Sequence, residues 1–146
     1  MSDHEIESIK QLKARYFRLM DTKQWDDWGE CFTRDCHFDT AVEMERNGLD
    51  GSLGIIDGRA DLVAYMRQWV DPAETVHHGH MPEIELVTPD EARGTWAMYD
   101  RVRVPGDPAL EFEGYGHYHE TYRKGDDGRW RIADLRLSRI RVVPIP

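Results

Sequence analysis

Cysteine is scarce in this sequence, and long apolar runs are missing. The 146 residues include two cysteines, Cys31 and Cys36, whose spacing does not match the CxxC pattern of redox or zinc motifs. We therefore expect two reduced thiols. No run of about eighteen apolar residues occurs, and the acidic start MSDHEIESIK has no apolar centre of the kind found in signal peptides. These absences predict a cytoplasmic protein without a membrane segment.

Positive charge is also in short supply. Lysine and arginine together number 19 against 28 aspartates and glutamates, which gives a net charge of −9. Nucleic acids and anionic membranes are bound through clustered lysine and arginine, so neither is expected as a partner. Glycine-rich loops that hold nucleotide phosphates are missing too, because the segments DGR and GDDG lack the required context. The length fits one domain, residues 1–146.

Three stretches in the first half have the apolar spacing of helices. They lie at about residues 3–20, 25–32 and 62–69. In the first of them, Lys13 falls among the polar residues that are expected to face solvent. Residues 37–43 alternate as a strand does, and they are expected to form a short hairpin with residues 55–56.

Only strand patterns follow residue 74. Four long alternating segments are separated by turn sequences rich in Pro, Gly and Asp, and they lie at about residues 75–88, 92–105, 109–123 and 129–143. Strands of this length joined by short turns form a meander that must curl. Helices first and strands later predict an α+β fold in which the helices cover one face of a curved sheet.

The segment ETVHHGHMPEIEL, residues 74–86, places three histidines within four positions near the start of a strand. Histidine is the side chain whose pKa lies closest to neutrality, so it is the usual proton carrier or metal ligand. The alternation that ends at Leu86, continued backwards, would put His78 and His80 on the apolar face and His77 on the other. A β-bulge at the intervening glycine or proline would reverse this assignment.

The order of the predicted elements, together with four sequence blocks, resembles the SnoaL-like branch of the nuclear transport factor 2-like (NTF2-like) superfamily. This branch includes scytalone dehydratase and bile acid 7α-dehydratase. The blocks are IKQLKARYFRLMDTKQWDD, VHHGHMPEIEL, GTWAMYDRV and GRWRIADLRLSRI. The resemblance implies a cone, in which three helices pack on one strongly curved mixed or antiparallel sheet around an internal pocket. The superfamily hosts many chemistries as well as non-catalytic binders.

Within this resemblance, four residues take catalytic positions. The Asp that ends the first helix corresponds to Asp21, and the first His of the histidine block corresponds to His77. Together they would form a catalytic dyad. A helix tyrosine of the bile acid enzyme corresponds to Tyr16, and its strand aspartate corresponds to Asp100.

The remaining predicted site residues would bind substrate. The sequence departs from the dehydratases at two positions, since Thr40 lies where they have a first-strand tyrosine and Met20 replaces a tyrosine beside the catalytic Asp. An apolar pocket wall is expected from bulky side chains on several elements. The candidates for substrate binding are Trp96, Met98, Phe38, Trp69, Met20 and His117.

Two of the catalytic candidates also have structural interpretations. Asp21 and Gln24 fit a capping box for the second helix. Asp100 interrupts an apolar strand face, where a carboxylate is costly to desolvate unless it has a partner. It is therefore either a functional group in a cavity, which we favour, or one half of an ion pair with an arginine across the sheet.

The resemblance implies a cofactor-independent lyase, a dehydratase acting on a cyclic hydroxy-carbonyl compound of polyketide, aromatic or steroid type. His77 would move the proton, and Asp21 would fix its tautomer. Tyr16 and Asp100 would hydrogen-bond the substrate oxygens. A ketosteroid-isomerase-like proton shuttle and a non-catalytic ligand-binding module are the alternatives.

The histidines leave a further alternative open. His117 and His119 repeat the HxH pattern of His78 and His80, and HxH pairs occur in the metal sites of cupins. A cupin would not begin with two helices, so we expect no metal and no other cofactor. Open faces of large sheets seldom stay bare, which predicts a homo-oligomer. The resemblance favours a trimer over a dimer.

Overall fold

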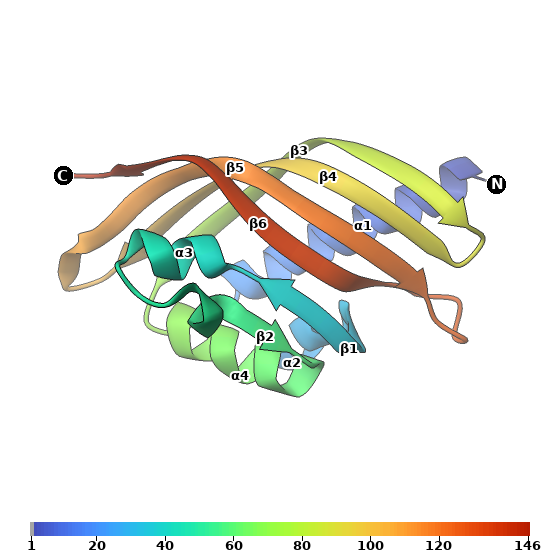
Figure 1. Cartoon of the computed structure of the whole chain (residues 1–146), viewed down its shortest axis with the longest axis horizontal. Helices are drawn as coiled ribbons and strands as arrows, with labels where there is room; N and C mark the ends of the chain where they lie inside the picture. Colours follow the sequence, from blue (N-terminus) through green and yellow to red (C-terminus); the bar gives the residue numbers. More distant parts are fainter. Residues whose placement is uncertain (1) are drawn as a thin grey trace.

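The computed structural model describes residues 2–146 and consists of one long curved sheet with helices against one of its faces (Figure 1). In chain order the elements are α1 (Ser2–Asp21), α2 (Trp25–Gly29), β1 (Phe32–Asp39), α3 (Ala41–Arg46), the 3-10 helix η1 (Gly51–Gly54), β2 (Ile55–Asp57), α4 (Arg59–Val70), β3 (Glu74–Thr88), β4 (Glu91–Val104), β5 (Asp107–Lys124) and β6 (Trp130–Pro144). The predicted α+β architecture is confirmed.

The six strands form a single sheet in the order β2-β1-β6-β5-β4-β3. Strands β3 to β6 are an antiparallel meander, and β1 joins it by running parallel to β6. The four long strands match their predicted ranges to within one or two residues at most ends. The long strands curve around α1, which lies behind the sheet in Figure 1. We call the face toward α1 the inner face and the opposite one the outer face.

The hairpin predicted between residues 37–43 and 55–56 is correct in its pairing and wrong in its details. Strands β1 and β2 pair antiparallel, with Phe38 opposite Ile56. The second half of the first segment, however, is the helix α3 rather than strand. Asp39 ends the strand, and its carboxylate accepts a hydrogen bond from the backbone N–H of Ala41 (3.0 Å), which favours the turn into the helix.

The hydrophobic core lies between α1 and the inner face of the sheet. It is built from the apolar stripe of α1, the tryptophans of α2 and inward residues of every long strand except β3, whose inward apolar residues Ile84 and Leu86 are half-buried. Members include Ile9, Leu12, Leu19, Met20, Trp25, Trp28, Phe32, Phe38, Trp96, Met98, Tyr118, Tyr122, Ile132 and Leu135. The prediction that Lys13 faces solvent is wrong, since its side chain is completely buried in this core.

Strand β3 contains a bulge that decides which histidine points inward. Its pairing with β4 shifts between His80 and Glu83, and Met81 has a φ of 39°. The extra residue reverses the alternation. His77 therefore shares the inner face with Thr75, and Ile84 shares the same face beyond the bulge, whereas His80 is exposed.

The two cysteines are unpaired and buried. Burial raises the pKa of the Cys31 and Cys36 thiols to about 11. A thiol with such a pKa is mainly protonated near neutrality, so neither cysteine has the properties of a reactive nucleophile. Among residues 2–146, no helix combines the length and the apolar character needed to span a membrane.

Candidate active site

Asp21 and His77 form the centre of the candidate site. Asp21 is the last residue of α1, and His77 lies on β3, which passes beside that end of the helix. The Nδ1 atom of His77 donates to Asp21 Oδ1 over 2.6 Å, and the His77 backbone N–H donates to Asp21 Oδ2 over 2.9 Å. Because Nδ1 carries the proton, the other ring nitrogen, Nε2, is the basic one in the neutral imidazole.

Asp21 accepts a third hydrogen bond from β3, and it does not cap the second helix. The Thr75 hydroxyl donates to Asp21 Oδ1 over 2.9 Å. The N-cap of α2 is Gln24, and no side chain caps this helix. The carboxylate is thus directed to β3 and fixes the imidazole at the ring and at the backbone. The side chains of Asp21 and His77 are 22% and 10% exposed, so the pair is largely shielded from water.

Phe17 holds the imidazole from the side, a contact that the sequence did not suggest. Its ring stacks on His77 with centroids 6.3 Å apart and planes 13° from parallel. Gly79, two residues beyond His77, makes room for this ring, because a Cβ at that position would lie 2.7 Å from Phe17 Cε2. The glycine within the histidine block is therefore the signal that could have indicated an aromatic ring packed on the strand.

Replacing Gly79 by Ala is expected to displace Phe17 from His77. The added methyl group also meets Trp96 at 3.1 Å, so the ring has little space to yield. Overpacking of this kind costs about 1–3 kcal/mol of unfolding free energy. Urea unfolding measures the loss, and the nitrogen NMR signals of His77 report the displaced ring. Unchanged stability together with unchanged His77 signals would contradict the contact.

Asp100 lies directly opposite His77 in the pairing of β3 with β4, and it forms an ion pair. Arg139 on β6 donates to both of its oxygens, over 2.8 and 2.9 Å, and donates from Nε to Glu43 of α3 over 2.5 Å. Of the two interpretations of Asp100, the structure therefore shows the ion pair with an arginine across the sheet, and not the favoured functional group in a cavity. Asp100 Oδ2 is 3.9 Å from His77 Nε2, so this pair borders the base.

Arg139 and Glu43 are site residues that sequence reasoning missed. The signal was Gly114, which is paired with Asp100 across β4 and β5. A Cβ there would lie 2.2 Å from Asp100 Oδ1 and 2.3 Å from Arg139 Nη1. The glycine leaves the space through which the guanidinium of Arg139 reaches across β5 to the carboxylate.

Tyr16 is buried among other rings rather than open to a cavity. It packs edge-on against Tyr118 of β5, with ring centroids 6.0 Å apart. Burial, followed by the neighbouring Tyr118, raises the pKa of the Tyr16 phenol well above its ordinary value. Burial is also the main cause that raises the pKa of the Tyr118 phenol well above its ordinary value, and the nearby carboxylate of Asp100 is the second cause. Both phenols thus stay protonated and can act as hydrogen-bond donors beside Asp21 and Asp100.

Two of the predicted substrate-binding residues border this site. Trp96 lies beside Gly79, and its Nε1 donates to the Tyr122 hydroxyl over 2.9 Å. The sulfur of Met98 is 3.4 Å from Arg139 Nη1. Met20 and Phe38 are fully buried core residues, and the Phe38 ring packs on Phe32 of the same strand.

The predictions for Trp69 and His117 do not agree with the structure. Trp69 is 50% exposed on α4, where its ring neighbours Tyr65. His117 lies on the outer face beside His119, because the inward positions of β5 are taken by Tyr118 and its alternate neighbours. Sequence alternation gave two equivalent faces for β5, and only the packing of α1 decides between them.

The remaining histidines of the block also lie on the outer face. His78 and His80 are neighbours there, with ring centroids 6.1 Å apart, and His78 packs on Tyr99. Within residues 2–146, no three His, Cys, Asp or Glu side chains are grouped so that they could hold a metal ion. The single helix-covered sheet is not the fold of a cupin, and this difference in fold removes the basis of the cupin-like alternative.

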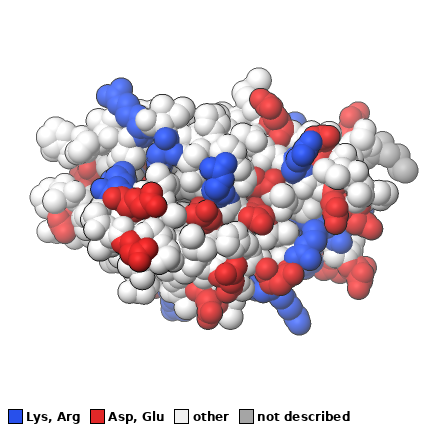
Figure 2. Space-filling model, in the orientation of Figure 1, with Lys and Arg blue, Asp and Glu red and all other residues white. Residues whose placement is uncertain are grey.

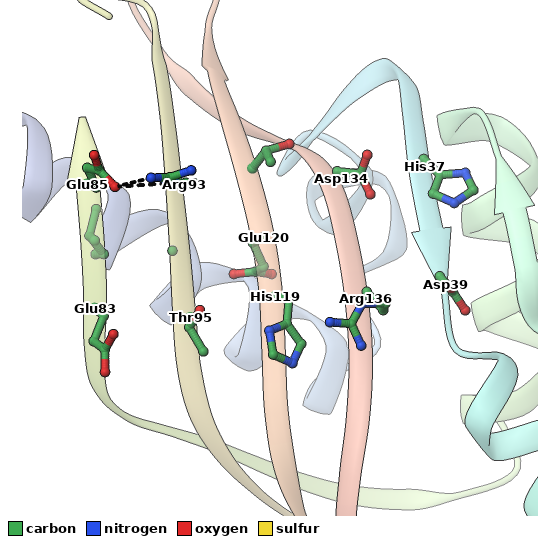
Figure 3. Close-up of a pocket in the computed structure, with 13 residues that line it drawn as sticks. His37, Asp39, Glu83, Glu85, Arg93, Thr95, His119, Glu120, Asp134 and Arg136 are labelled. Atoms are coloured by element: carbon green, nitrogen blue, oxygen red, sulfur yellow. Dashed lines mark hydrogen bonds and ion pairs between the residues drawn. The ribbon is translucent and has the colours of Figure 1, made fainter. Parts of the chain in front are cut away.

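The outer face carries a hollow of about 630 Å³ (Figure 3). Its labelled walls are mostly charged, with Glu85 paired to Arg93 on one side and Asp134, Arg136 and His37 on the other. Neither His77 nor Asp21 lines it. The hollow therefore lies across the sheet from the candidate active site.

Comparison with known proteins agrees with this architecture. The fold is that of an NTF2-like cone, and the model of the SnoaL-like domain family matches residues 3–136. The chain belongs to the SnoaL-like family. The probable cyclase FGR4 of Gibberella zeae is 30% identical over 138 residues, which are 90% of this chain and 89% of that protein.

Two solved structures are similar in fold. A scytalone dehydratase-like protein from Novosphingobium aromaticivorans superimposes with a TM-score of 0.82 at 18% identity, over 100% of this chain and 93% of its own. The hexachlorocyclohexane dehydrochlorinase LinA (type 2) superimposes with a TM-score of 0.81 at 16% identity, over 98% of this chain and 90% of its own. At these identities the likeness establishes the cone-shaped fold.

Proposed function

We propose that this protein is a cofactor-independent lyase, a dehydratase that removes water from a cyclic hydroxy-carbonyl compound. The observation that carries the proposal is the 2.6 Å hydrogen bond from His77 Nδ1 to Asp21, which leaves Nε2 as a base facing Asp100 and Arg139. The names of two similar proteins, a dehydratase-like protein and a dehydrochlorinase, support it, because loss of water and loss of HCl each include proton removal from carbon.

The reaction needs one proton to move twice. His77 Nε2 takes the proton from the carbon next to the carbonyl, and Asp21 stabilises the imidazolium that results. The C–O bond to the hydroxyl then breaks, the electrons form the C=C bond, and the imidazolium gives its proton to the departing oxygen as water. Atoms and charge balance without an added cofactor.

The substrate carbonyl gains negative charge in this reaction, and the site contains donors for it. Arg139 donates from Nη1 to Asp100 and to the Met98 sulfur, from Nη2 to Asp100 and from Nε to Glu43, so one N–H of Nη2 is left for a substrate oxygen. The phenol of Tyr118 is a second donor. Such donors act strongly in a site from which water is excluded.

The charges around the base favour a neutral substrate. Asp100 and Glu43 both pair with the guanidinium of Arg139, and a third carboxylate, that of Asp21, pairs with His77. An anionic group placed among them would be repelled, and shielding from water strengthens that repulsion. An uncharged ring compound with a hydroxyl and a carbonyl group meets these conditions, and Trp96 with Phe17 supplies apolar surface for the ring.

The experiment is a turnover assay on a panel of cyclic β-hydroxy ketones and cyclic β,γ-unsaturated ketones, each with neutral and carboxylated members. Loss of water is followed by the absorbance of the conjugated product. Formation of a conjugated ketone without water loss would indicate the isomerase alternative, and no reaction with any member, combined with tight binding, would indicate the non-catalytic one. A preference for carboxylated members would contradict the charge argument.

We further propose that copies of the chain associate through the outer face, with a trimer favoured. This face is not covered by any helix among residues 2–146, and Tyr115 and Ile140 are exposed on its last two strands. Lysine, arginine and acidic side chains are intermixed in the view of Figure 2, so one copy can offer both signs to another. Light scattering at micromolar concentration is expected to give three times the mass of one chain. A monomer would overturn this proposal.

A further inference from the structure

Lys13 lies where a lysine is seldom found. Its side chain is 0% exposed, and its Nζ is 2.7 Å from Glu120 Oε2, whose side chain is equally buried. The Tyr122 hydroxyl donates to the second oxygen of Glu120 over 2.8 Å and accepts from Trp96 Nε1 over 2.9 Å. Burial lowers the pKa of the Lys13 ammonium, and the charge of Glu120 opposes this shift. The ammonium is thus fixed in one place.

Three aromatic rings surround this ammonium. Lys13 Nζ lies 3.7 Å from the ring centroid of Tyr16, 3.8 Å from that of Tyr118 and 4.9 Å from that of Phe17. Each distance is within the range of a cation–π contact, and such contacts are strongest away from water. Tyr16 and Phe17 belong to α1, whereas Tyr118 belongs to β5, so the charge ties the rings of two elements together.

The same three rings form one side of the candidate active site. Phe17 stacks on His77, and the phenol of Tyr118 is close enough to Asp100 for that carboxylate to raise its pKa. Tyr16 packs against both other rings, with centroids 5.3 Å from Phe17 and 6.0 Å from Tyr118. Lys13 is therefore separated from the base by a single ring.

We propose that Lys13 is a positioning residue: its ammonium, fixed by Glu120, holds the rings of Phe17, Tyr16 and Tyr118 in the orientation that the reaction needs. The inference rests on the proposed function. Stability alone does not account for the Lys13–Glu120 pair, because apolar residues of similar size usually replace a buried ion pair without loss. A fixed point charge among three rings also restricts the orientation of each ring plane, and apolar packing alone restricts these orientations less.

The test removes both charges together. Lys13→Met with Glu120→Gln keeps the side-chain sizes and leaves no buried charge unpaired. The matched control is Lys124→Met with Glu5→Gln, which removes a second Lys–Glu pair (2.8 Å) that also joins α1 to β5. That pair lies beside Trp130 and not beside the three rings.

NMR of the unliganded protein gives the first readout, and it needs no substrate. The ¹³Cζ signals of Tyr16 and Tyr118 and the ring nitrogen signals of His77 are expected to shift in the Met–Gln variant and not in the control. The second readout is turnover on the substrate found with the panel: kcat is expected to fall at least tenfold with KM nearly unchanged, at a temperature where the variant is folded.

The outcomes separate this inference from the proposed function. Unshifted NMR signals, or full kcat, in the folded Met–Gln variant would overturn the role of Lys13 even if His77 proves essential. Full turnover in a His77→Ala variant would overturn the proposed function whatever Lys13 does. If the Met–Gln variant does not fold, Lys13→Arg takes its place, since a planar guanidinium cannot sit over both tyrosine rings in the same way. Signals and kcat identical to those of the unsubstituted protein would then overturn the inference.

Discussion

Replacing His77 by Ala is expected to slow the chemical step on the order of 10²–10⁴-fold while changing ligand affinity little. His77 Nε2 is the basic nitrogen at the site, because Nδ1 is engaged by Asp21, and no other histidine of the block lies on the inner face. The control is His78→Ala, which removes the neighbouring imidazole on the outer face. It should retain full turnover, and comparable losses in both variants would contradict the assignment.

Asp21→Asn is the companion change, and its expected effects follow from three hydrogen bonds. The carboxylate accepts from His77 at Nδ1 and at the backbone N–H, and from the Thr75 hydroxyl. An amide has one acceptor oxygen in place of two, so at least one donor loses its partner, which costs about 1–3 kcal/mol. Turnover should also fall, by less than in His77→Ala, because the amide cannot stabilise the imidazolium. If the turnover and the unfolding free energy of Asp21→Asn are both unchanged, the result contradicts the dyad.

Replacing Arg139 by Met is expected to produce the largest loss of stability. It leaves Asp100 and Glu43 without their shared partner, and Asp100 is only 4% exposed. Removing one member of a buried ion pair typically costs about 3–5 kcal/mol, since the remaining charge stays desolvated. Urea unfolding measures the change. Adding Asp100→Asn to Arg139→Met should restore part of it, because the carboxylate that was left unpaired is then neutral.

A neighbouring arginine provides the control for this prediction. Arg101 follows Asp100 on β4 and pairs with Glu111 at 3.1 Å, but its side chain is 47% exposed. Exposed pairs contribute about 0–1 kcal/mol. Arg101→Met should therefore change the unfolding free energy by less than about 1 kcal/mol. Equal losses for the two arginines would show that burial of the Arg139 pair has no energetic effect.

The long elements of this fold were predictable because their patterns are long. The stripe of α1 and the four strands of the meander each extend over a dozen residues or more, so single exceptions do not hide the period. The six-residue helix α3 was not predictable, since Phe38 and Val42, an even number of positions apart among mostly polar residues, fit a strand equally well. The Asp21–His77 pairing came from the family resemblance, as periodicity cannot bring residues 56 positions apart together.

The partners of buried charges were the main omission. The sequence predicts a solvent-facing Lys13 because lysine is seldom buried, and its partner Glu120 is 107 residues away. Arg139 lies among apolar residues near the end of β6 and gave no sign of a role. In both cases the information is in the register of the sheet, which pairs Asp100 with Gly114 and decides which strand faces point to α1. Hydrophobic alternation defines which residues of one strand share a face, but it does not define which residues of the neighbouring strands or helices lie opposite them.

The bulge in β3 makes the candidate site depend on chain length as well as on residue type. Before Met81 the strand turns His77 inward, and beyond it the strand turns Ile84 and Leu86 inward, so the two halves differ by one residue in phase. A strand of this length without the bulge would alternate regularly, so that with its apolar half on the core the imidazole would face solvent. Deleting Met81 would remove the extra residue, and regular alternation would then leave both His77 and Ile84 facing α1. The direction of the base is therefore set by one residue whose own side chain is exposed to solvent.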